Sequence, residues 1–406
     1  MNKPRHAEGG VCSAKGFRAA AAAGAIKYGG RDDVALIVAD EPCAAAAVFT
    51  TNKVAAAPVV YDRAVAKRGK AQAILANSGC ANACTGEAGA KDAELSALLA
   101  AGELGIDPSL VFVASTGVIG RRLPVDRLAD GMRKAAARLG RKPEDGLAAA
   151  KAVMTTDTRP KQACVKTTID GKTVTVGGCA KGSGMIEPNM ATMLAFVTTD
   201  AAVSPAMLKK ALVLAVARSF NRLVVDGDES TNDSLFLLAS GKAGNAAITR
   251  PGDDFRAFAA ALEAVCVSLA RQMAKDGEGA TKFVSVTVKG AKTARDAERA
   301  ARAIAKSPLA KTSWFGRDPN WGRVLAAAGY SGAEVDAMKA EVFYDGVWAF
   351  RRGEVAGERQ LGLLAEVLAK DEFEVVVDLH LGKAQDTIYT CDFSVEYVHI
   401  NADYTT

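Results

Sequence analysis

The sequence predicts an α/β fold in which mixed β-sheets are layered with helices. Short runs rich in β-branched residues alternate with Ala- and Leu-rich runs at helical spacing along all 406 residues. Hydrophobic residues make up 49% of the chain, which is ample for a large core. No linker, low-complexity tract or internal repeat divides the sequence, so its length allows two domains or one large body.

Strands are expected where apolar β-formers cluster, and helices where Ala and Leu recur with a helical period. The expected strands are residues 34–39, 46–51, 72–77, 111–116, 235–240, 283–288 and 373–379. The expected helices are residues 91–104, 124–138, 205–219, 254–275, 294–306 and 358–369. Residues 165–178 predict a hairpin, because two β-branched runs flank Asp170-Gly171, a dipeptide that favours a two-residue turn.

The N-terminal segment resembles a signal peptide only weakly. Four basic residues precede the run "AAAAAGAI", which is too weakly apolar for a signal core and leads into the strand pattern "DDVALIVAD". No apolar run is expected to approach the length needed to span a membrane. These features predict a soluble, cytoplasmic protein.

Charge and cysteine usage exclude several classes of protein. The 51 basic and 46 acidic residues nearly balance at a net charge of +5, which gives no electrostatic case for nucleic-acid binding. The most basic stretch, residues 120–142, is expected to be a helix with its charges in water. Only Cys80 and Cys84 of the eight cysteines lie close together, so neither a disulfide framework nor a zinc site is expected, and the thiols are interpreted as buried.

Three segments resemble phosphate-, dinucleotide- or calcium-binding motifs, but each lacks a residue that the motif requires. "GKT" belongs to the hairpin turn, and Lys166 stands where a P-loop needs its first glycine. "GEGATK" lacks the last glycine of a dinucleotide loop. "DGDESTNDS" (226–234) resembles a calcium loop, but Thr231 and Leu237 replace the turn glycine and the bidentate Glu, so a polar turn is expected.

Histidine chemistry has few candidates. A Ser-His-Asp or Cys-His enzyme would have to use His6, His380 or His399. His380 and His399 lie in strand-like patterns, which favours structural roles for both.

The stretch "KGSGMIEPNMATMLAF" (181–196) offers a different route to catalysis. Thr192 follows the small Ala191 where a glycine-containing loop becomes an apolar strand pattern. A threonine at a chain terminus can use its own α-amine as base. Thr192 would first have to attack the Ala191 carbonyl, shift the acyl group from N to O, and lose it to water. From local features alone, an inert loop threonine is the commoner alternative.

The same stretch resembles the cleavage segment of the ornithine acetyltransferase (glutamate N-acetyltransferase) family, bifunctional proteins of arginine biosynthesis. Nine further segments resemble the family in order and cover nearly the whole chain: "GFRAAAAAGAIKYGGRDDVALI", "FTTNKVAAAPV", "NSGCANACTG", "ASTGVIG", "MTTDTRPK", "VDGDESTNDS", "DGEGATKF", "WFGRDPNWGRV" and "INADYTT". The resemblance implies a self-cleaving N-terminal-nucleophile-type acyltransferase fold. It also implies cleavage into chains 1–191 and 192–406, intertwined in one structural unit and assembled as a heterotetramer.

The resemblance also assigns site residues. Thr192 corresponds to the nucleophile, and the Thr116 hydroxyl and Gly117 N–H correspond to the oxyanion hole. The substrate-binding positions correspond to Thr192 itself and to Thr155, Lys181, Glu278, Asn401 and Thr406. Lys181 is expected to pair with a substrate carboxylate and Glu278 with an ammonium. Cys80 and Glu187 depart from the family pattern without touching these positions.

The implied reaction moves an acetyl group from N2-acetyl-L-ornithine to L-glutamate by a ping-pong route through acetyl-Thr192. It needs no metal or organic cofactor. The sequence leaves open whether acetyl-CoA is also a donor, whether arginine or ornithine inhibits, and which oligomer forms. Two alternatives differ in chemistry: an amidase or aminopeptidase of the same fold, and a small-molecule binding protein in which Thr192 is inert.

Overall fold

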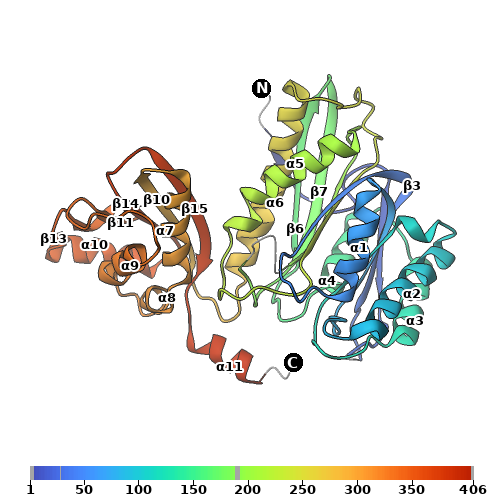
Figure 1. The fold of residues 1–406 in the computed structure, drawn as a ribbon, viewed down its shortest axis with the longest axis horizontal. Coiled ribbons are helices and arrows are strands. Elements are labelled where there is room, and N and C mark those ends of the chain that lie inside the picture. The colour runs from blue at the N-terminus through green and yellow to red at the C-terminus, as the bar shows by residue number, and fades with distance from the viewer. Residues whose placement is uncertain (1–3, 28, 188–192, 404–406) are drawn as a thin grey trace. The chain divides into compact units, whose positions relative to one another are not determined.

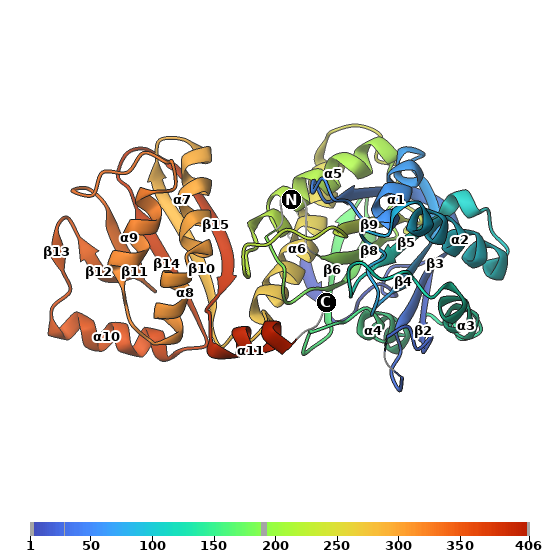
Figure 2. The same cartoon turned by 60° about the horizontal axis from the view of Figure 1, so that its bottom comes forward.

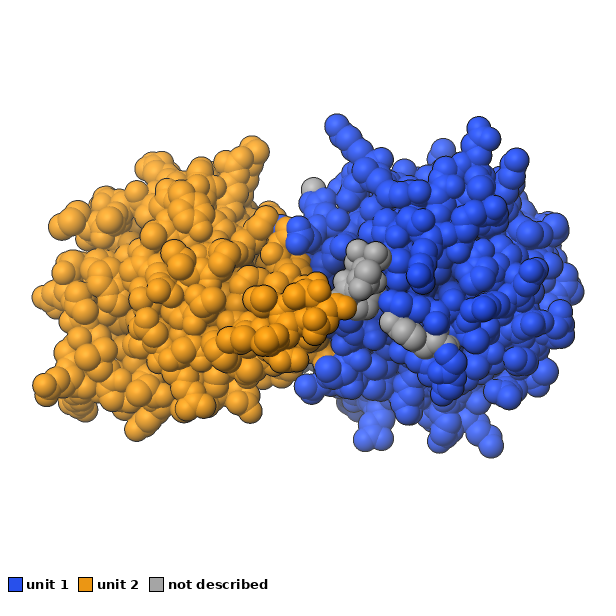
Figure 3. Space-filling view, turned by 90° about the horizontal axis from the view of Figure 1, so that it is seen from below, with its two compact units in different colours: residues 1–221, 228–273, 406 blue, residues 222–227, 274–405 orange. Residues whose placement is uncertain are grey.

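A computed structural model describes residues 4–27, 29–187 and 193–403. They form two compact units, coloured separately in Figure 3. Unit 1 contains the described residues of 1–221 and 228–273, and unit 2 contains 222–227 together with the described residues from 274 onward. Ala191, Thr192 and Thr406 lie outside the described residues.

Unit 1 is built on a mixed sheet, which has nine strands within the described residues. The strand order is β1-β6-β7-β8-β9-β3-β4-β5, with β2 paired to β3, and β4–β5 and β8–β9 are its parallel pairs. The strands are β1 (Arg5–Ala7), β2 (Phe17–Ala22), β3 (Val34–Phe49), β4 (Lys70–Asn77), β5 (Val111–Ser115), β6 (Lys161–Ile169), β7 (Lys172–Lys181), β8 (Leu194–Thr199) and β9 (Ser234–Ala239).

Helices bury both faces of this sheet (Figures 1 and 2). They are α1 (Ala57–Lys67), α2 (Gly86–Leu104), α3 (Val125–Ala136), α4 (Pro143–Ala152), α5 (Pro205–Ala217) and α6 (Asp253–Lys275). Alternate residues of β3 enter two cores: Ile37 packs with residues of α4, and Leu36 with residues of α2 and α3. Burial on both faces explains why these strands are nearly continuous apolar runs.

Unit 2 has its own sheet, which is six-stranded in the described part of the chain, in the order β13-β12-β11-β14-β10-β15. The strands are β10 (Phe283–Ala291), β11 (Glu341–Tyr344), β12 (Val347–Arg351), β13 (Glu354–Val355), β14 (Glu372–Asp378) and β15 (Ala384–Cys391). The helices are α7 (Ala294–Lys306), α8 (Pro308–Phe315), α9 (Trp321–Gly329), α10 (Glu358–Ala369) and α11 (Val395–Asp403). Val286 of β10 and Ile304 of α7 belong to its separate core.

The predicted α/β class and the listed strands and helices are confirmed, with changes. The ranges 34–39 and 46–51 are one strand, β3, whose register with β4 shifts between Val38 and Cys43. The hairpin is β6–β7, and both Asp170 and Gly171 have positive φ (50° and 69°), as a primed turn requires. The alanine run after Phe17 is strand β2, because its backbone pairs with the N-terminal half of β3 and its alanines are buried.

One expectation for helices and strands was wrong. The segment around His399 is helix α11, although its β-branched residues suggested a strand. The helix expected in the basic stretch 120–142 is confirmed as α3, whose buried side chains face the unit 1 core and whose charged residues are exposed as expected.

Helix α6 corrects the expectation about membrane-spanning length. By length and composition alone it could cross a membrane, the one helix in the described residues that could. Its fully buried Phe258, Leu262, Val265 and Leu269 recur every three or four residues, and the charged Glu263 and Arg271 lie at positions that are only partly buried. This pattern is typical of a core helix with one solvated face.

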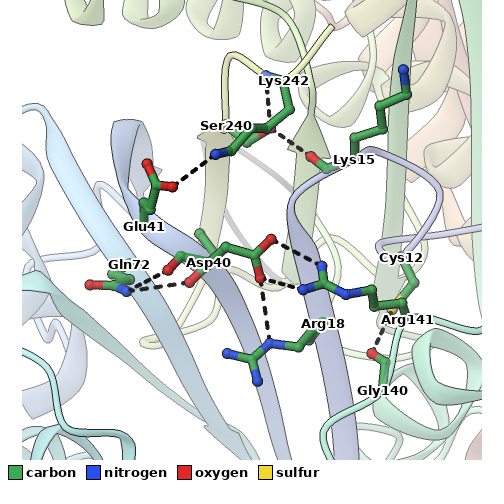
Figure 4. A network of polar contacts seen from close by, with 11 residues as sticks. Cys12, Lys15, Arg18, Asp40, Glu41, Gln72, Gly140, Arg141, Ser240 and Lys242 are labelled. Carbon is green, nitrogen blue, oxygen red and sulfur yellow. Dashed lines mark hydrogen bonds and ion pairs between the residues drawn. The ribbon is translucent and has the colours of Figure 1, made fainter.

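Charged side chains surround the part of β3 where its register with β4 shifts (Figure 4). The Asp40 carboxylate accepts hydrogen bonds from both terminal nitrogens of Arg141 (3.0 and 2.8 Å) and lies 3.5 Å from Nε of Arg18. The hydrogen-bonded guanidinium of Arg141 holds the pKa of Asp40 below its usual value. This pair joins the loop before α4 to the irregular part of β3.

Candidate active site

The predicted oxyanion pair lies in a turn directly after strand β5. Gly117 has φ +128°, and a Cβ there would lie 2.4 Å from the carbonyl carbon of Gly79. Glycine is therefore required by the close approach of the two backbones. The Thr116 N–H donates to the Asn77 carbonyl at 3.0 Å, at the end of the neighbouring parallel strand β4. The turn is thus held against a second strand end.

Lys181 meets this turn from the far end of strand β7. Its Nζ donates a hydrogen bond to Oγ1 of Thr116 at 3.3 Å, and the residue is only 8% exposed. Accepting this bond leaves the Thr116 hydroxyl proton available for another acceptor. The structure thus brings together three residues that the sequence analysis selected from two distant segments.

Asp157, which the sequence analysis missed, organises the base of this cluster. Its carboxylate accepts hydrogen bonds from Nζ of Lys161 (2.6 Å), from the Gly182 N–H (2.7 Å) and from the Thr155 N–H (3.0 Å). Burial alone would raise the pKa of Asp157, but the charges of Lys181 and Lys161 and the hydrogen bonds lower it to about 2. An ionised carboxylate therefore joins Thr155 to the segment that follows Lys181.

The segment 226–234 also contributes buried polar groups. Asn232 donates from Nδ2 to the carbonyls of Ala81 (2.6 Å) and Ser115 (2.8 Å). Asp233 is fully buried, and this burial raises its pKa well above the usual value despite a hydrogen bond from the Met193 backbone and the charge of Lys181. The predicted polar turn is thus confirmed for residues 226–230, which are exposed or partly buried. Residues 231–234 are instead buried.

Two other predicted substrate residues meet within unit 2. Nδ2 of Asn401, on helix α11, donates to Oε2 of Glu278 at 2.8 Å and to the Tyr397 carbonyl at 3.0 Å. Gly279 has φ +67°, and the Ser394 hydroxyl donates to its carbonyl at 2.6 Å. The C-terminal helix therefore packs directly on the loop that carries Glu278, which is 8% exposed.

The cysteines and histidines supply no competing site in the described residues. All eight cysteines are free; six are buried as expected, whereas Cys12 is half-buried and Cys84 exposed. Burial raises the pKa of the Cys80 thiol, whose Sγ donates to the Arg121 carbonyl. His380 follows β14 and contacts the carboxylate of Glu341 at 3.1 Å, which is a structural role. The described residues hold no group of three His, Cys, Asp or Glu suited to a metal ion.

Comparison with known proteins decides the family. The model of the ArgJ family matches residues 18–406. The chain belongs to the ArgJ family.

Curated ArgJ relatives span the whole chain. The "Arginine biosynthesis bifunctional protein ArgJ" of Symbiobacterium thermophilum is 53% identical over 400 residues, covering 98% of this chain and 99% of the relative. The protein of the same name from Geobacter sulfurreducens is 51% identical over 392 residues, covering 97% and 99%.

Solved ArgJ structures match parts of the chain. The ArgJ structure from Bacillus halodurans is 40% identical, with a TM-score of 0.51, covering 52% of this chain and 100% of that one. The ornithine acetyltransferase from Mycobacterium tuberculosis, solved with ornithine, is also 40% identical, with a TM-score of 0.44, covering 47% and 100%.

Membership of the ArgJ family establishes the class of chemistry. The protein is an acyltransferase of arginine biosynthesis that acts on small molecules. The transferase interpretation is therefore favoured over both the amidase and the inert binding protein.

Proposed function

We propose that this ArgJ enzyme transfers the acetyl group of N2-acetyl-L-ornithine to L-glutamate through an acetyl ester on Thr192. The observation that carries the proposal is the contact between Lys181 and Thr116, because it places a cation and a free hydroxyl proton at one strand-end turn. A carbonyl oxygen that becomes negative needs such donors, whereas a merely structural threonine does not. Thr192 lies one residue before Met193, whose backbone contacts the buried Asp233.

The proposed cycle has two acyl transfers. The α-amine of Thr192 accepts the hydroxyl proton as its Oγ attacks the acetyl carbonyl, and the Thr116 hydroxyl and Gly117 N–H stabilise the oxyanion. The C–N bond then breaks, and the ornithine α-nitrogen leaves with that proton. The α-amine of glutamate attacks the ester in the reverse sense, which gives N-acetylglutamate and restores the threonine hydroxyl.

Lys181, in unit 1, and Glu278, in unit 2, are each proposed as a substrate contact. The Lys181 ammonium lies beside Thr116, and its positive charge suits it to bind a substrate carboxylate. Glu278 and Asn401 are joined by a hydrogen bond within unit 2, and Glu278 can pair with a substrate ammonium. Thr155 and Thr406 remain proposed substrate contacts on the family resemblance.

Maturation into chains 1–191 and 192–406 is part of the same proposal. Strand β7 ends at Lys181, and its antiparallel neighbour β8 begins at Leu194, so the two pieces would stay paired in one sheet after cleavage. The solved Bacillus halodurans chain, covered over its full length, matches 52% of this protein, close to the share that residues 192–406 represent. The strand pairing supports pieces that stay intertwined, and the length of the solved chain supports a division near the middle of the protein.

The proposed working form is a cytoplasmic heterotetramer of two copies of each chain, without a metal or organic cofactor. The chemistry supports the cofactor proposal, because amide and ester exchange between amines needs only a nucleophile, a base and oxyanion donors. Acetyl-CoA is an additional donor to be tested.

Product formation with and without glutamate tests the function. With glutamate, ornithine and N-acetylglutamate should appear at equal rates. Without glutamate, ornithine should appear only once per site, because the acetyl ester has no acceptor. Continuous ornithine release at the same rate without glutamate would instead identify an amidase. Adding acetyl-CoA and glutamate alone tests the second donor.

A further inference from the structure

We propose that Asn232 is a positioning residue that fixes the orientation of the Thr116–Gly117 turn. The inference rests on the proposed oxyanion role of that turn. Asn232 lies in the loop before strand β9, outside the turn itself.

The side-chain amide of Asn232 has a single possible orientation. The residue is 7% exposed, and Nδ2 donates to the carbonyls of Ala81 (2.6 Å) and Ser115 (2.8 Å). Its Oδ1 accepts a hydrogen bond from Oγ1 of Thr231 at 2.7 Å. All the polar groups of the amide are therefore satisfied, and rotation would leave buried groups unpaired.

Of the two carbonyls that Asn232 binds, the Ser115 carbonyl directly precedes the turn, and the Ala81 carbonyl belongs to the segment packed against it. The Ser115 carbonyl shares a peptide plane with the Thr116 N–H, which donates to the Asn77 carbonyl at 3.0 Å. This plane is therefore held at both edges. The Ala81 N–H donates to the Val118 carbonyl at 3.0 Å, so Asn232 also anchors the segment packed against Gly117.

This arrangement links the turn to the strands beside it. Ser234, two residues after Asn232, starts β9 and pairs with Leu194 at the start of the parallel strand β8. A movement of the 231–233 loop would thus change where Thr116 lies relative to the start of β8. Because an error of about 1 Å in the position of a catalytic group can cost roughly 100-fold in rate, the amide has a direct effect on turnover.

Asn232→Ala tests the proposal, with Asn245→Ala as the matched control. Asn245 is also 7% exposed in unit 1, and its Nδ2 donates to the carbonyls of Ala202 (3.2 Å) and Ala246 (2.8 Å). Both variants should lower Tm by similar amounts. Only Asn232→Ala should lower kcat, by roughly 10- to 100-fold, with KM for N2-acetylornithine changed less than threefold. An unchanged kcat in mature Asn232→Ala would overturn the proposal.

A double-mutant cycle separates this role from general loss of packing. If Asn232 acts through Thr116, Asn232→Ala should lower kcat by a smaller factor in a Thr116→Ala background than in the wild type. Equal factors in both backgrounds would contradict the proposal. If Asn232→Ala does not mature, Asn232→Ser, which keeps one donor, takes its place with the same two readouts.

The double-mutant cycle also distinguishes failure of the proposed oxyanion role of Thr116 from failure of the positioning role of Asn232. A normal kcat in Thr116→Ala would remove the proposed oxyanion role. A reduced kcat in Thr116→Ala together with a normal kcat in Asn232→Ala would remove only the positioning role.

Discussion

Nζ of Lys181 donates a hydrogen bond of 3.3 Å to Oγ1 of Thr116, across 65 positions of sequence. Lys181 is the last residue of strand β7, and Thr116 directly follows strand β5 of the same sheet. A rigid sheet therefore fixes their separation, which is what a group that stabilises charge during a reaction requires.

Thr116→Ala should lower kcat by roughly 10²–10³, because one oxyanion donor is lost in both acyl transfers. KM for N2-acetylornithine should change much less, since the donor acts mainly in the transition state. Steady-state rates of the mature, folded variant provide the measurement. Thr287→Ala is the control: it removes a hydroxyl bonded to Glu374 and Thr387 in unit 2 and should leave kcat unchanged. A normal kcat in Thr116→Ala would exclude Thr116 from the mechanism.

Lys181→Met should raise KM for N2-acetylornithine by about tenfold or more, because a charge-assisted contact to the substrate carboxylate is lost. It should also lower kcat, since the Thr116 hydroxyl loses its donor. Lys209→Met is a suitable control, because Lys209 is an exposed lysine of unit 1 whose Nζ donates to the Ala47 carbonyl. Unchanged KM and kcat in Lys181→Met would show that the lysine is structural.

Asp157→Asn should destabilise the protein at pH 7 by about 3–5 kcal/mol, because it removes the carboxylate charge that forms a buried ion pair with the Lys161 ammonium. The folded-state pKa of Asp157, about 2, lies below the ordinary value of 3.8. Its stabilising effect is thus complete above about pH 5 and is lost as the pH falls through the unfolded pKa towards 2.

Urea unfolding of wild type and Asp157→Asn at pH 7, 4 and 2.5 measures this effect. The difference in the free energy of unfolding should shrink as the pH falls. Asp40→Asn is the comparison, because the more exposed Asp40–Arg141 pair should contribute less. A difference that stays constant with pH would show that Asp157 is not ionised in the folded protein.

The rate of acetyl transfer should rise with pH through an apparent pKa of roughly 7–8. The proposed base is an α-amine, which must be neutral to accept the hydroxyl proton, and α-amines ordinarily titrate in this range. The profile of kcat/KM under conditions where chemistry limits the rate gives the value. A rate that is flat from about pH 5.5 to 9 would require a different base.

The sequence predicted elements with strong periodicity and missed those defined by tertiary pairing. The β6–β7 turn was predicted from Asp170-Gly171, because the preference of this dipeptide for positive φ depends only on the two residues themselves. Strand β2 was missed because an alanine run has no period that distinguishes strand from helix, and only pairing with β3 makes it a strand. Helix α11 was missed because its valines and isoleucine favour a strand in isolation.

The same limit applies to the candidate site. Thr116, Gly117, Lys181 and Thr155 were found through family resemblance, and the fold brings them into one cluster. Asp157 and Asn232 stand inside the resembling segments "MTTDTRPK" and "VDGDESTNDS", but each also binds a backbone group in another segment, Gly182 for Asp157 and Ser115 for Asn232. No periodicity reports such contacts, so only the three-dimensional structure could reveal them.

The most direct test of the account is the intact mass of the purified protein after incubation with N2-acetylornithine alone. The account predicts two polypeptides, 1–191 and 192–406, with one acetyl group on the second, located at Thr192 by fragmentation. Added glutamate should remove that group, and Thr192→Ala should give one uncut, unacetylated and inactive chain. A fully active protein that stays uncut, or an acetyl group on any other residue, would contradict the account.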